Sequence, residues 1–299
     1  METIVKCENV NKKIGSKQIL KDVSFEVNSG DILAFIGPNG AGKTTTIKLM
    51  LGLQKITSGN IYINGYDIKK NFVKAISKVG AIVENPDSYM YLSGYDNLKM
   101  AQNLYGRKDK AELEAIIKKI GLENRIHDKV SKYSLGMRQR LGIGLALLNH
   151  PNLLILDEPT NGLDPEGIRD LRNLLKSLAK EGMAIFVSSH NLAELESFCN
   201  KVVIIQNGVI IDSAKTKDLK HDVSDAGSIY TIVVDSNKKL GKKYELVDED
   251  KVIVKGNKEN VAKVVSELVV LGKKIYLVTE QELSLEEAFL KKTGGNKID

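Results

Sequence analysis

A glycine-rich stretch at residues 37–44, Gly-Pro-Asn-Gly-Ala-Gly-Lys-Thr, constrains the fold of this chain more than any other feature. It matches the pattern GxxxxGK[ST], follows the continuously apolar segment 32–36 and precedes a helical pattern over residues 44–53. Such a loop lets backbone N–H groups turn inward around a phosphate chain, and the helix N-terminus adds partial positive charge at the same point. The sequence therefore predicts a buried strand, a phosphate-binding loop and a helix, with a nucleotide as the ligand.

The predicted phosphate site extends from the loop into the first turn of the helix. Its residues are Gly37, Pro38, Asn39, Gly40, Ala41, Gly42, Lys43, Thr44 and Thr45. Lys43 is expected to reach the β and γ phosphates, and the hydroxyl of Thr44 is expected to bind Mg²⁺. The alternative is a glycine-rich loop with an incidental lysine, which the flanking strand and helix disfavour.

An acidic pair, Asp157-Glu158, follows a second buried strand, residues 153–156. Acidic pairs after strands are often only turn residues, but a phosphate loop earlier in the chain makes a metal site the expected complement. We therefore assign Asp157 to Mg²⁺ and Glu158 to activation of the attacking water. For Glu158 to act as the base, its pKa must suit the operating pH, or the proton must move on as the reaction completes.

Two kinds of strand occur along the first two thirds of the chain. Alternating polar and apolar residues predict an antiparallel layer at residues 4–10, 23–27 and 61–63. Continuously apolar segments predict further buried parallel strands at residues 79–83 and 184–188, with helical patterns between them. The pattern is that of an α/β sheet with an added antiparallel layer.

Residues 88–150 favour a helical insertion, and residues 211–228 are polar enough to predict a linker or short helix. Within these and the following segment we predict helices at residues 111–120, 259–271 and 284–290 and strands at residues 202–205, 229–234, 252–254 and 275–278. The predicted fold class is α/β, a P-loop NTPase core over residues 2–220 with a parallel sheet, an antiparallel subdomain and the helical insertion. A small α+β accessory domain is predicted at residues 224–299.

The composition of the chain limits where the protein can reside but does not distinguish between possible functions. The net charge of +6 suits phosphate, nucleic acid or an anionic membrane surface alike, but it is too small to imply a nucleic-acid groove. The two cysteines, Cys7 and Cys199, lie among apolar neighbours, which favours buried thiols in a reducing compartment over a disulfide framework. No segment approaches the ~18 apolar residues that a membrane-spanning helix requires, so we expect neither secretion nor a membrane span.

Residues 133–140, Tyr-Ser-Leu-Gly-Met-Arg-Gln-Arg, resemble the signature motif of ABC transporter ATPases. The order of motifs strengthens the resemblance, because residues 161–164, Asn-Gly-Leu-Asp, resemble the family's D-loop and His190 resembles its switch histidine. The resemblance covers about residues 2–220. In motif style the chain is most similar to the ATP-binding subunits of bacitracin-type and lantibiotic-type peptide-antibiotic exporters.

The signature also has a physical interpretation of its own. Ser134 is a good N-cap for a helix over residues 135–148, and Gly136 leaves room for close backbone approach, so this helix end is a second anion site. The resemblance implies a head-to-tail homodimer in which Ser134 and Gly136 of one copy close over MgATP held by the other. It further implies that His190 contacts the γ-phosphate and positions Glu158, and that Asp164 bridges the copies.

Two positions depart from the family pattern. Glu84 stands where the family usually has the Q-loop glutamine, which leaves a metal contact open but removes a hydrogen-bond donor. Whether Glu84 is a direct metal ligand stays open. Ile14 stands where the family stacks an aromatic side chain on adenine, and it offers dispersion contact without a π-face.

The resemblance implies a membrane permease on a separate chain and a location on the cytoplasmic face of the cell membrane, with a role in antibiotic resistance. The surface that includes Tyr89, Tyr91 and Tyr95 resembles the family's groove for a helix of that permease, although these tyrosines are equally compatible with local core. The alternative function is a soluble ABC ATPase that switches a protein or nucleic-acid complex; a nucleotide kinase fits the signature less well. The C-terminal domain could regulate, dimerise or simply stabilise the ATPase domain.

Overall fold

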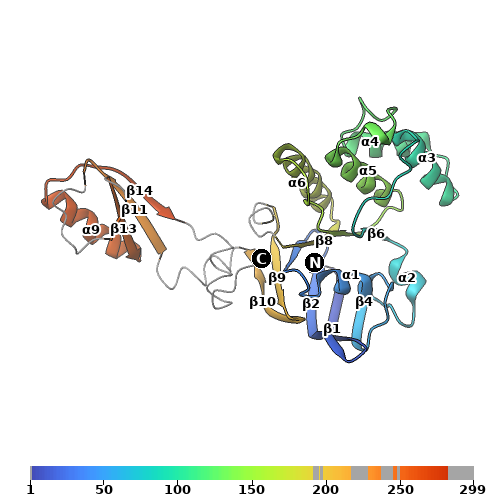
Figure 1. The fold of residues 1–299 in the computed structure, drawn as a ribbon, viewed down its shortest axis with the longest axis horizontal. Helices are drawn as coiled ribbons and strands as arrows, with labels where there is room; N and C mark the ends of the chain where they lie inside the picture. The colour runs from blue at the N-terminus through green and yellow to red at the C-terminus, as the bar shows by residue number, and fades with distance from the viewer. Residues whose placement is uncertain are drawn as a thin grey trace. The chain divides into compact units, whose positions relative to one another are not determined.

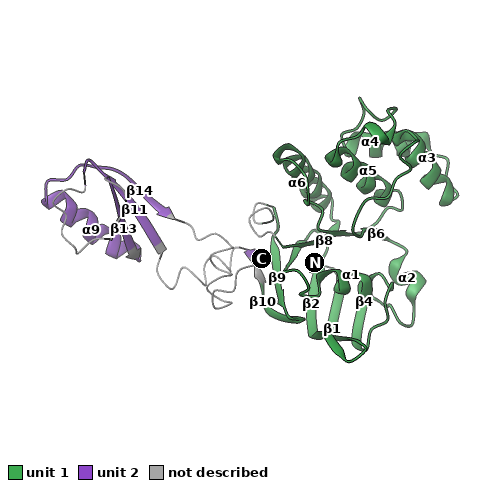
Figure 2. Cartoon of the chain, in the orientation of Figure 1, with its two compact units in different colours: residues 1–214, 298–299 green, residues 215–297 purple. Residues whose placement is uncertain are grey.

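The computed structural model describes residues 2–190, 195, 198–216, 228–236, 245–247 and 250–281. The chain divides into two compact units, the first including residues 1–214 and the second residues 215–297 (Figure 2). The helix predicted at residues 284–290 lies outside the described residues.

The antiparallel layer of unit 1 has the strand order β2-β1-β4-β5. Its strands are β1 (Thr3–Ile14), β2 (Lys17–Asn28), β4 (Ser58–Ile63) and β5 (Tyr66–Asp67). Val23, Phe25 and Val27 are buried while the residues between them are exposed, as expected for a sheet with one face on the core. The predicted antiparallel layer is confirmed.

A six-stranded sheet with the order β10-β9-β3-β8-β7-β6 crosses the middle of unit 1. It is built from β3 (Ile32–Ile36), β6 (Val79–Ile82), β7 (Leu153–Asp157), β8 (Ala184–Ser189), β9 (Lys201–Gln206) and β10 (Val209–Lys215). The β3–β8, β3–β9, β7–β8 and β6–β7 pairs are parallel. Every residue of β3, β7 and β8 is buried, which is why these strands are continuously apolar or nearly so.

Strand β10 corrects one prediction, because residues 211–215 belong to a strand and not to a polar linker. The turn Asn207-Gly208, with φ of +49° and +77°, reverses the chain after β9, and the β-branched run Val209-Ile210-Ile211 continues as the next strand. Polar residues are tolerated in β10 because it forms an edge of the sheet.

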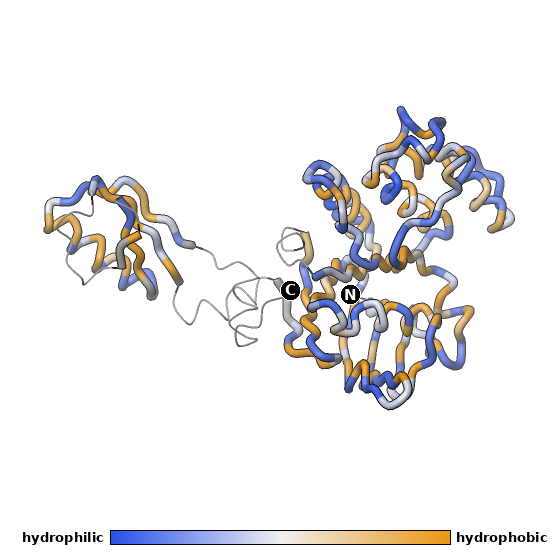
Figure 3. Tube along the Cα trace, viewed as in Figure 1, coloured by the Kyte–Doolittle hydropathy of each residue, from blue (hydrophilic) through white to orange (hydrophobic). Residues whose placement is uncertain are grey.

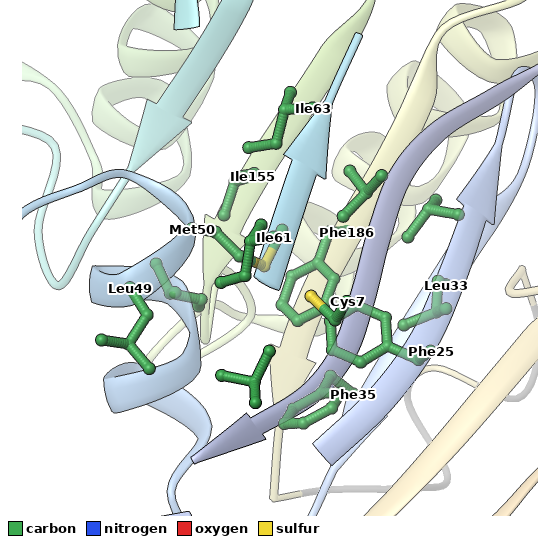
Figure 4. Packing of buried hydrophobic residues seen from close by; sticks show 14 of the residues in the cluster. Cys7, Phe25, Leu33, Phe35, Leu49, Met50, Ile61, Ile63, Ile155 and Phe186 are labelled. Carbon is green, nitrogen blue, oxygen red and sulfur yellow. The ribbon is translucent and has the colours of Figure 1, made fainter. Parts of the chain in front are cut away.

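The core of unit 1 fills the space between the two sheets. The rings of Phe25, Phe35 and Phe186 pack together with centroids 5.3–5.7 Å apart. Helix α1 (Lys43–Met50) adds Leu49 and Met50 to the same cluster (Figure 4). Cys7 and Cys199 are both buried, and burial raises the pKa of both thiols, as the sequence-based interpretation of buried thiols requires.

The helices of unit 1 are short and mostly capped. Besides α1 they are α2 (Phe72–Ile76), α3 (Gly94–Leu104), α4 (Lys110–Lys119), the 3₁₀ turn η1 (Val130–Lys132), α5 (Leu135–Leu147) and α6 (Pro165–Lys180). The side chains of Ser93, Asp109, Ser134 and Asp164 cap α3 to α6 by accepting backbone N–H groups. Figure 1 shows α3–α6 on the side of the parallel sheet away from β1, β2 and β4. The insertion predicted at residues 88–150 corresponds to α3–α5, and α6 lies on the same side of the sheet.

Unit 2 contains a four-stranded antiparallel sheet with the order β12-β13-β11-β14 and one described helix. Its elements are β11 (Ser228–Val234), β12 (Glu245–Val247), β13 (Lys251–Gly256), α9 (Lys258–Val270) and β14 (Ile275–Gln281). Val261 and Leu268 of α9 pack on buried apolar residues of β11 and β13. Figure 3 shows apolar and polar stretches alternating along the trace of both units. No helix in the described part of the chain is long and apolar enough to cross a membrane.

Candidate nucleotide site

The glycine-rich loop connects the C-terminal end of β3 to the first turn of α1. Gly42, the N-cap of α1, has φ of +109°, and Gly40 has φ of +78°, conformations that residues with a side chain rarely adopt. At Gly37 a Cβ atom would lie 2.2 Å from the carbonyl oxygen of Ile205. The glycines of the motif are therefore required by the local backbone, as the sequence pattern predicted.

Lys43 lies inside this loop with its side chain only 5% exposed. Its ammonium group donates to the carbonyl oxygens of Gly37 at 2.8 Å and Pro38 at 3.3 Å. Its third partner is Oε1 of Glu158, at 3.2 Å. The loop of β3 and the acidic pair after β7 thus meet at one ammonium group, although more than a hundred residues separate them in the chain.

Glu158 is held on both carboxylate oxygens. Its Oε2 accepts from Nδ2 of Asn161 and lies 2.7 Å from Nδ1 of His190. Burial raises the pKa of the Glu158 carboxyl, but the charge of Lys43 and the hydrogen bonds from Lys43, His190 and Asn161 outweigh burial and leave the pKa below its ordinary value. Glu158 is therefore an ionised, oriented carboxylate at neutral pH. Because the ionised carboxylate can only accept a hydrogen bond, Nδ1 of His190 must carry the hydrogen in this contact.

Ser188, at the end of β8, connects both members of the acidic pair. Its hydroxyl donates to Oδ1 of Asp157 at 2.5 Å and accepts from the backbone N–H of Glu158 at 2.9 Å. Sequence analysis missed this residue and gave Asn161 no role of its own. The available signal was the change from apolar residues to Ser188-Ser189 at the end of an otherwise apolar strand, directly before His190.

The hydroxyl and carboxylate predicted to bind Mg²⁺ line one cavity of about 320 Å³. Thr44, Asp157, Glu158 and Glu84 all contribute to its wall. These are hard oxygen donors of the kind that Mg²⁺ prefers, and no cluster of three or more His, Cys, Asp or Glu at metal spacing occurs among the described residues. The donor set fits a magnesium ion held by few protein oxygens, which leaves coordination positions for water and phosphate.

Glu84 has an additional partner that the sequence did not indicate. Its Oε1 lies 3.0 Å from Nζ of Lys48, one helical turn after Thr44 on α1. The Glu84 backbone has φ of +68°, and its side chain is 66% exposed. The carboxylate therefore lies at the wall of the cavity and is paired with a lysine.

Ser134, Gly136 and Asp164 lie together at the starts of α5 and α6. Ser134 accepts from the N–H of Met137, and Asp164 accepts from the N–H of Gly167, so each caps a helix. A Cβ on Gly136 would lie 3.6 Å from the Cα of Gly167. Across the described part of the chain, no hydrogen bond or ion pair joins Ser134, Gly136 or Asp164 to residues 37–45. Leu135, the residue between Ser134 and Gly136, lines the same cavity as Thr44 and Glu158, so the start of α5 borders this cavity without a direct bond to the glycine-rich loop.

Ile14 ends β1 at the surface, where its side chain is 52% exposed. It contributes to none of the contacts around Lys43 and Glu158 described above. Its predicted contact with adenine therefore stays a prediction.

A groove of about 480 Å³ lies between β6 and helices α3 and α5, directly after Glu84 in the chain. Tyr89 lines it, and its ring meets that of Tyr91 edge-on at 5.9 Å. Tyr91 is 68% exposed, whereas Tyr95 is half-buried with its ring against His127. The predicted exposed surface therefore includes Tyr89 and Tyr91, while Tyr95 packs locally because it lies in the first turn of α3.

The fold and the glycine-rich loop define a P-loop nucleotide-binding protein. Its segment 133–140, which resembles the ABC signature motif, caps a second helix through Ser134. Comparison with known proteins specifies the family. Residues 20–161 match the family model described as ABC transporter. The chain is 44% identical over 299 residues to the ABC transporter ATP-binding protein YhcH of Bacillus subtilis, covering 99% of this chain and 98% of that protein. The chain belongs to the ATP-binding proteins of ABC transporters, which are ATPases.

Two further relatives bear on function. The chain is 38% identical over 323 residues to the bacitracin transport ATP-binding protein BcrA of Bacillus licheniformis, covering all of both proteins. It is similar to the ATP-binding cassette MJ0796, solved as a dimer in a post-hydrolysis state with ADP and Pi, with 25% identity and a TM-score of 0.63 over 71% of this chain and 99% of that one. The resemblance to bacitracin-type ATPases is confirmed, and the relatives give no support to the soluble-switch alternative.

Proposed function

We propose that this protein hydrolyses ATP to drive export of a peptide antibiotic or another amphipathic compound through a separate membrane subunit, and so contributes to antibiotic resistance. The proposal rests on the contacts that hold the Glu158 carboxylate in place: its two oxygens contact Lys43, His190 and Asn161. Support for the transported class comes from BcrA, whose name assigns it to bacitracin transport.

In the proposed mechanism the backbone N–H groups of residues 39–45 cradle the phosphates, and Lys43 neutralises charge on the β and γ groups. Thr44 and Asp157 would hold Mg²⁺, which supplies further positive charge to the phosphates. Glu158, ionised and oriented, accepts a proton from the attacking water. His190 positions Glu158 through Nδ1–H, and its Nε2 can donate to phosphate at the same time only when the ring is protonated.

Two copies are proposed to face each other head to tail. Ser134 caps α5 and Gly136 lies in its first turn, and the partial positive charge of this helix N-terminus suits a nucleotide phosphate held by a second copy. Asp164 would meet the partner near the same water. Support comes from the dimeric relative, and hydrolysis would release the pair by removing the shared γ-phosphate.

The membrane subunit is proposed to dock a short helix into the groove lined by Tyr89, which places the protein on the cytoplasmic face of the membrane. Unit 2 is proposed as an accessory domain, corresponding to the predicted residues 224–299.

The test is Glu158→Gln, which keeps the shape of the side chain but removes the base. We expect ATPase activity to fall at least a hundredfold, in the range of lost general-base catalysis, and MgATP to trap a dimer visible by light scattering. Glu114→Gln is the matched control, because Glu114 is exposed on α4 and its ion-pair partner among the described residues is Lys110. If Glu158→Gln stayed monomeric at saturating MgATP, even with its membrane subunit present, the head-to-tail arrangement would be wrong.

A further inference from the structure

A local cluster of lysines surrounds one short helix, α2. Residues 69–78 contain four lysines, Lys69, Lys70, Lys74 and Lys78, and no acidic residue, while the net charge of the whole chain is +6. All four side chains are exposed. The phosphate site uses none of them, so this basic segment has no role in the chemistry described above.

Exposed apolar side chains lie among these lysines. In α2 only Ala75 is fully buried, whereas Phe72 is 40% and Val73 77% exposed. Gly52 lies directly against the Phe72 ring, since a Cβ there would be 2.3 Å from it, and this brings the neighbouring Leu53, 64% exposed, next to α2. We call this surface the α2 patch; it consists of Leu53, Phe72, Val73, Lys69, Lys70 and Lys74.

The charge of the α2 patch is not compensated by carboxylates. None of its lysines forms an ion pair within the described part of the chain. Lys69 donates its ammonium N–H to the carbonyl oxygen of Gly59, and Lys74 lies 5.7 Å from the centre of the Tyr66 ring, so both contacts are with uncharged groups. The nearest acidic side chain in sequence, Asp67, accepts from the backbone N–H of Lys69. The patch therefore presents net positive charge around protruding apolar side chains.

We infer that the α2 patch rests on an anionic lipid bilayer, with Val73 and Phe72 in the headgroup region and the lysines against lipid phosphates. A bilayer accepts a protruding side chain such as Val73 without a matching pocket, which a folded protein partner would have to provide. The inference rests on the proposed function, which brings the protein to the membrane. The α2 patch lies close to the groove proposed for the membrane subunit, because only Ser77 and Lys78 separate α2 from β6, which lines that groove.

The absence of tryptophan from the sequence allows a direct test on the full chain. Val73→Trp introduces a single fluorophore at the most exposed point of the patch. We expect its emission to shift to shorter wavelength when phosphatidylglycerol-containing vesicles are added without nucleotide, and to change little with pure phosphatidylcholine vesicles. Val209→Trp, a comparably apolar exposed position on β10, is the control and should not shift. An unshifted Val73→Trp spectrum would overturn the inference.

A second variant tests the charges. Lys69, Lys70 and Lys74 changed together to Gln, in the Val73→Trp background, should weaken vesicle binding on the order of a hundredfold, because each lysine near an anionic surface contributes about fivefold. The same change at the exposed lysines Lys108, Lys110 and Lys118 removes equal charge from the region of α4 and should weaken it far less. Equal losses, or binding of nucleic acid in place of vesicles, would contradict the inference. ATPase activity measured without lipid should be unchanged in both triple variants, so this test is independent of the proposed hydrolysis.

Discussion

Replacing Ser188 with alanine removes one buried hydroxyl on which two site residues depend. The hydroxyl donates to Asp157 and accepts from the Glu158 N–H, and Ser188 has no exposed surface. A hydrogen bond to a charged group contributes about 1.5–3 kcal/mol and a neutral one about 0.5–1.5 kcal/mol. The Glu158 N–H keeps a second acceptor, the Ser188 carbonyl oxygen at 3.2 Å, so most of the loss falls on Asp157. We expect Ser188→Ala to lower the free energy of unfolding of unit 1 by about 2–3 kcal/mol.

This loss is large enough to measure by thermal unfolding. For a domain of the size of unit 1, 1 kcal/mol changes the melting temperature by about 2–4 °C, so the variant should unfold roughly 4–12 °C below the unmodified protein. The scan is made in EDTA, so that bound metal does not contribute. Ser177→Ala, at an exposed position on α6, is the control and should leave the melting temperature within a degree or two.

Ser188→Ala should also lower the affinity for magnesium and so raise the Mg²⁺ concentration that is needed, because the hydroxyl orients the carboxylate assigned to the metal. Loss of such an outer partner typically costs 10–100-fold in metal affinity or activity. The measurement is the Mg²⁺ concentration that half-saturates ATPase activity, taken well below the melting temperature. If Ser188→Ala melted and responded to Mg²⁺ like the unmodified protein, the hydroxyl would neither stabilise unit 1 nor orient Asp157.

Two further predictions concern the departures from the family pattern. Glu84→Gln should retain measurable ATPase activity, because glutamine keeps an oxygen for a metal contact and the ion pair with Lys48 that is lost is exposed and worth at most about 1 kcal/mol; a loss as complete as that of Glu158→Gln would contradict the division of roles. Ile14→Tyr should tighten ATP binding by adding a π-face on which the base can stack. Titration with ATP measures this, and an unchanged affinity would remove Ile14 from the base site.

The phosphate loop and its sheet could be predicted because their physical requirements are local. Strands β3 and β7 are buried on both faces, so each is a run of apolar residues, and the loop after β3 needs glycine at Gly37 and Gly42 for steric reasons. Ser134 was predictable as a cap because its hydroxyl satisfies an N–H only three residues away. In each case the physical requirement acts within a few residues of the chain, so the local sequence is enough to predict the structure.

The contacts that sequence analysis missed join residues far apart in the chain. Ser188 meets Asp157 and Glu158 only because β7 and β8 are neighbours in the sheet, and Lys48 meets Glu84 only because α1 lies beside the end of β6. Strand β10 was missed for a related reason. Its polar residues predict a linker, but its pairing with β9 holds the segment as a strand. Periodicity reports which face of an element is buried, but not which other element buries it.

The loop between β7 and α6 links the two predicted half-sites within one chain. Within the loop Asn161 bonds the carboxylate of Glu158, and just after it, in the first turn of α6, Gly167 packs against Gly136 in the first turn of α5. Asp164, by capping α6 at Gly167, fixes the loop between these points. A contact between two glycines has no flexible side chain to absorb a displacement. If a second copy brings its nucleotide to the start of α5 as proposed, this loop connects that position to the residue that holds the carboxylate of Glu158.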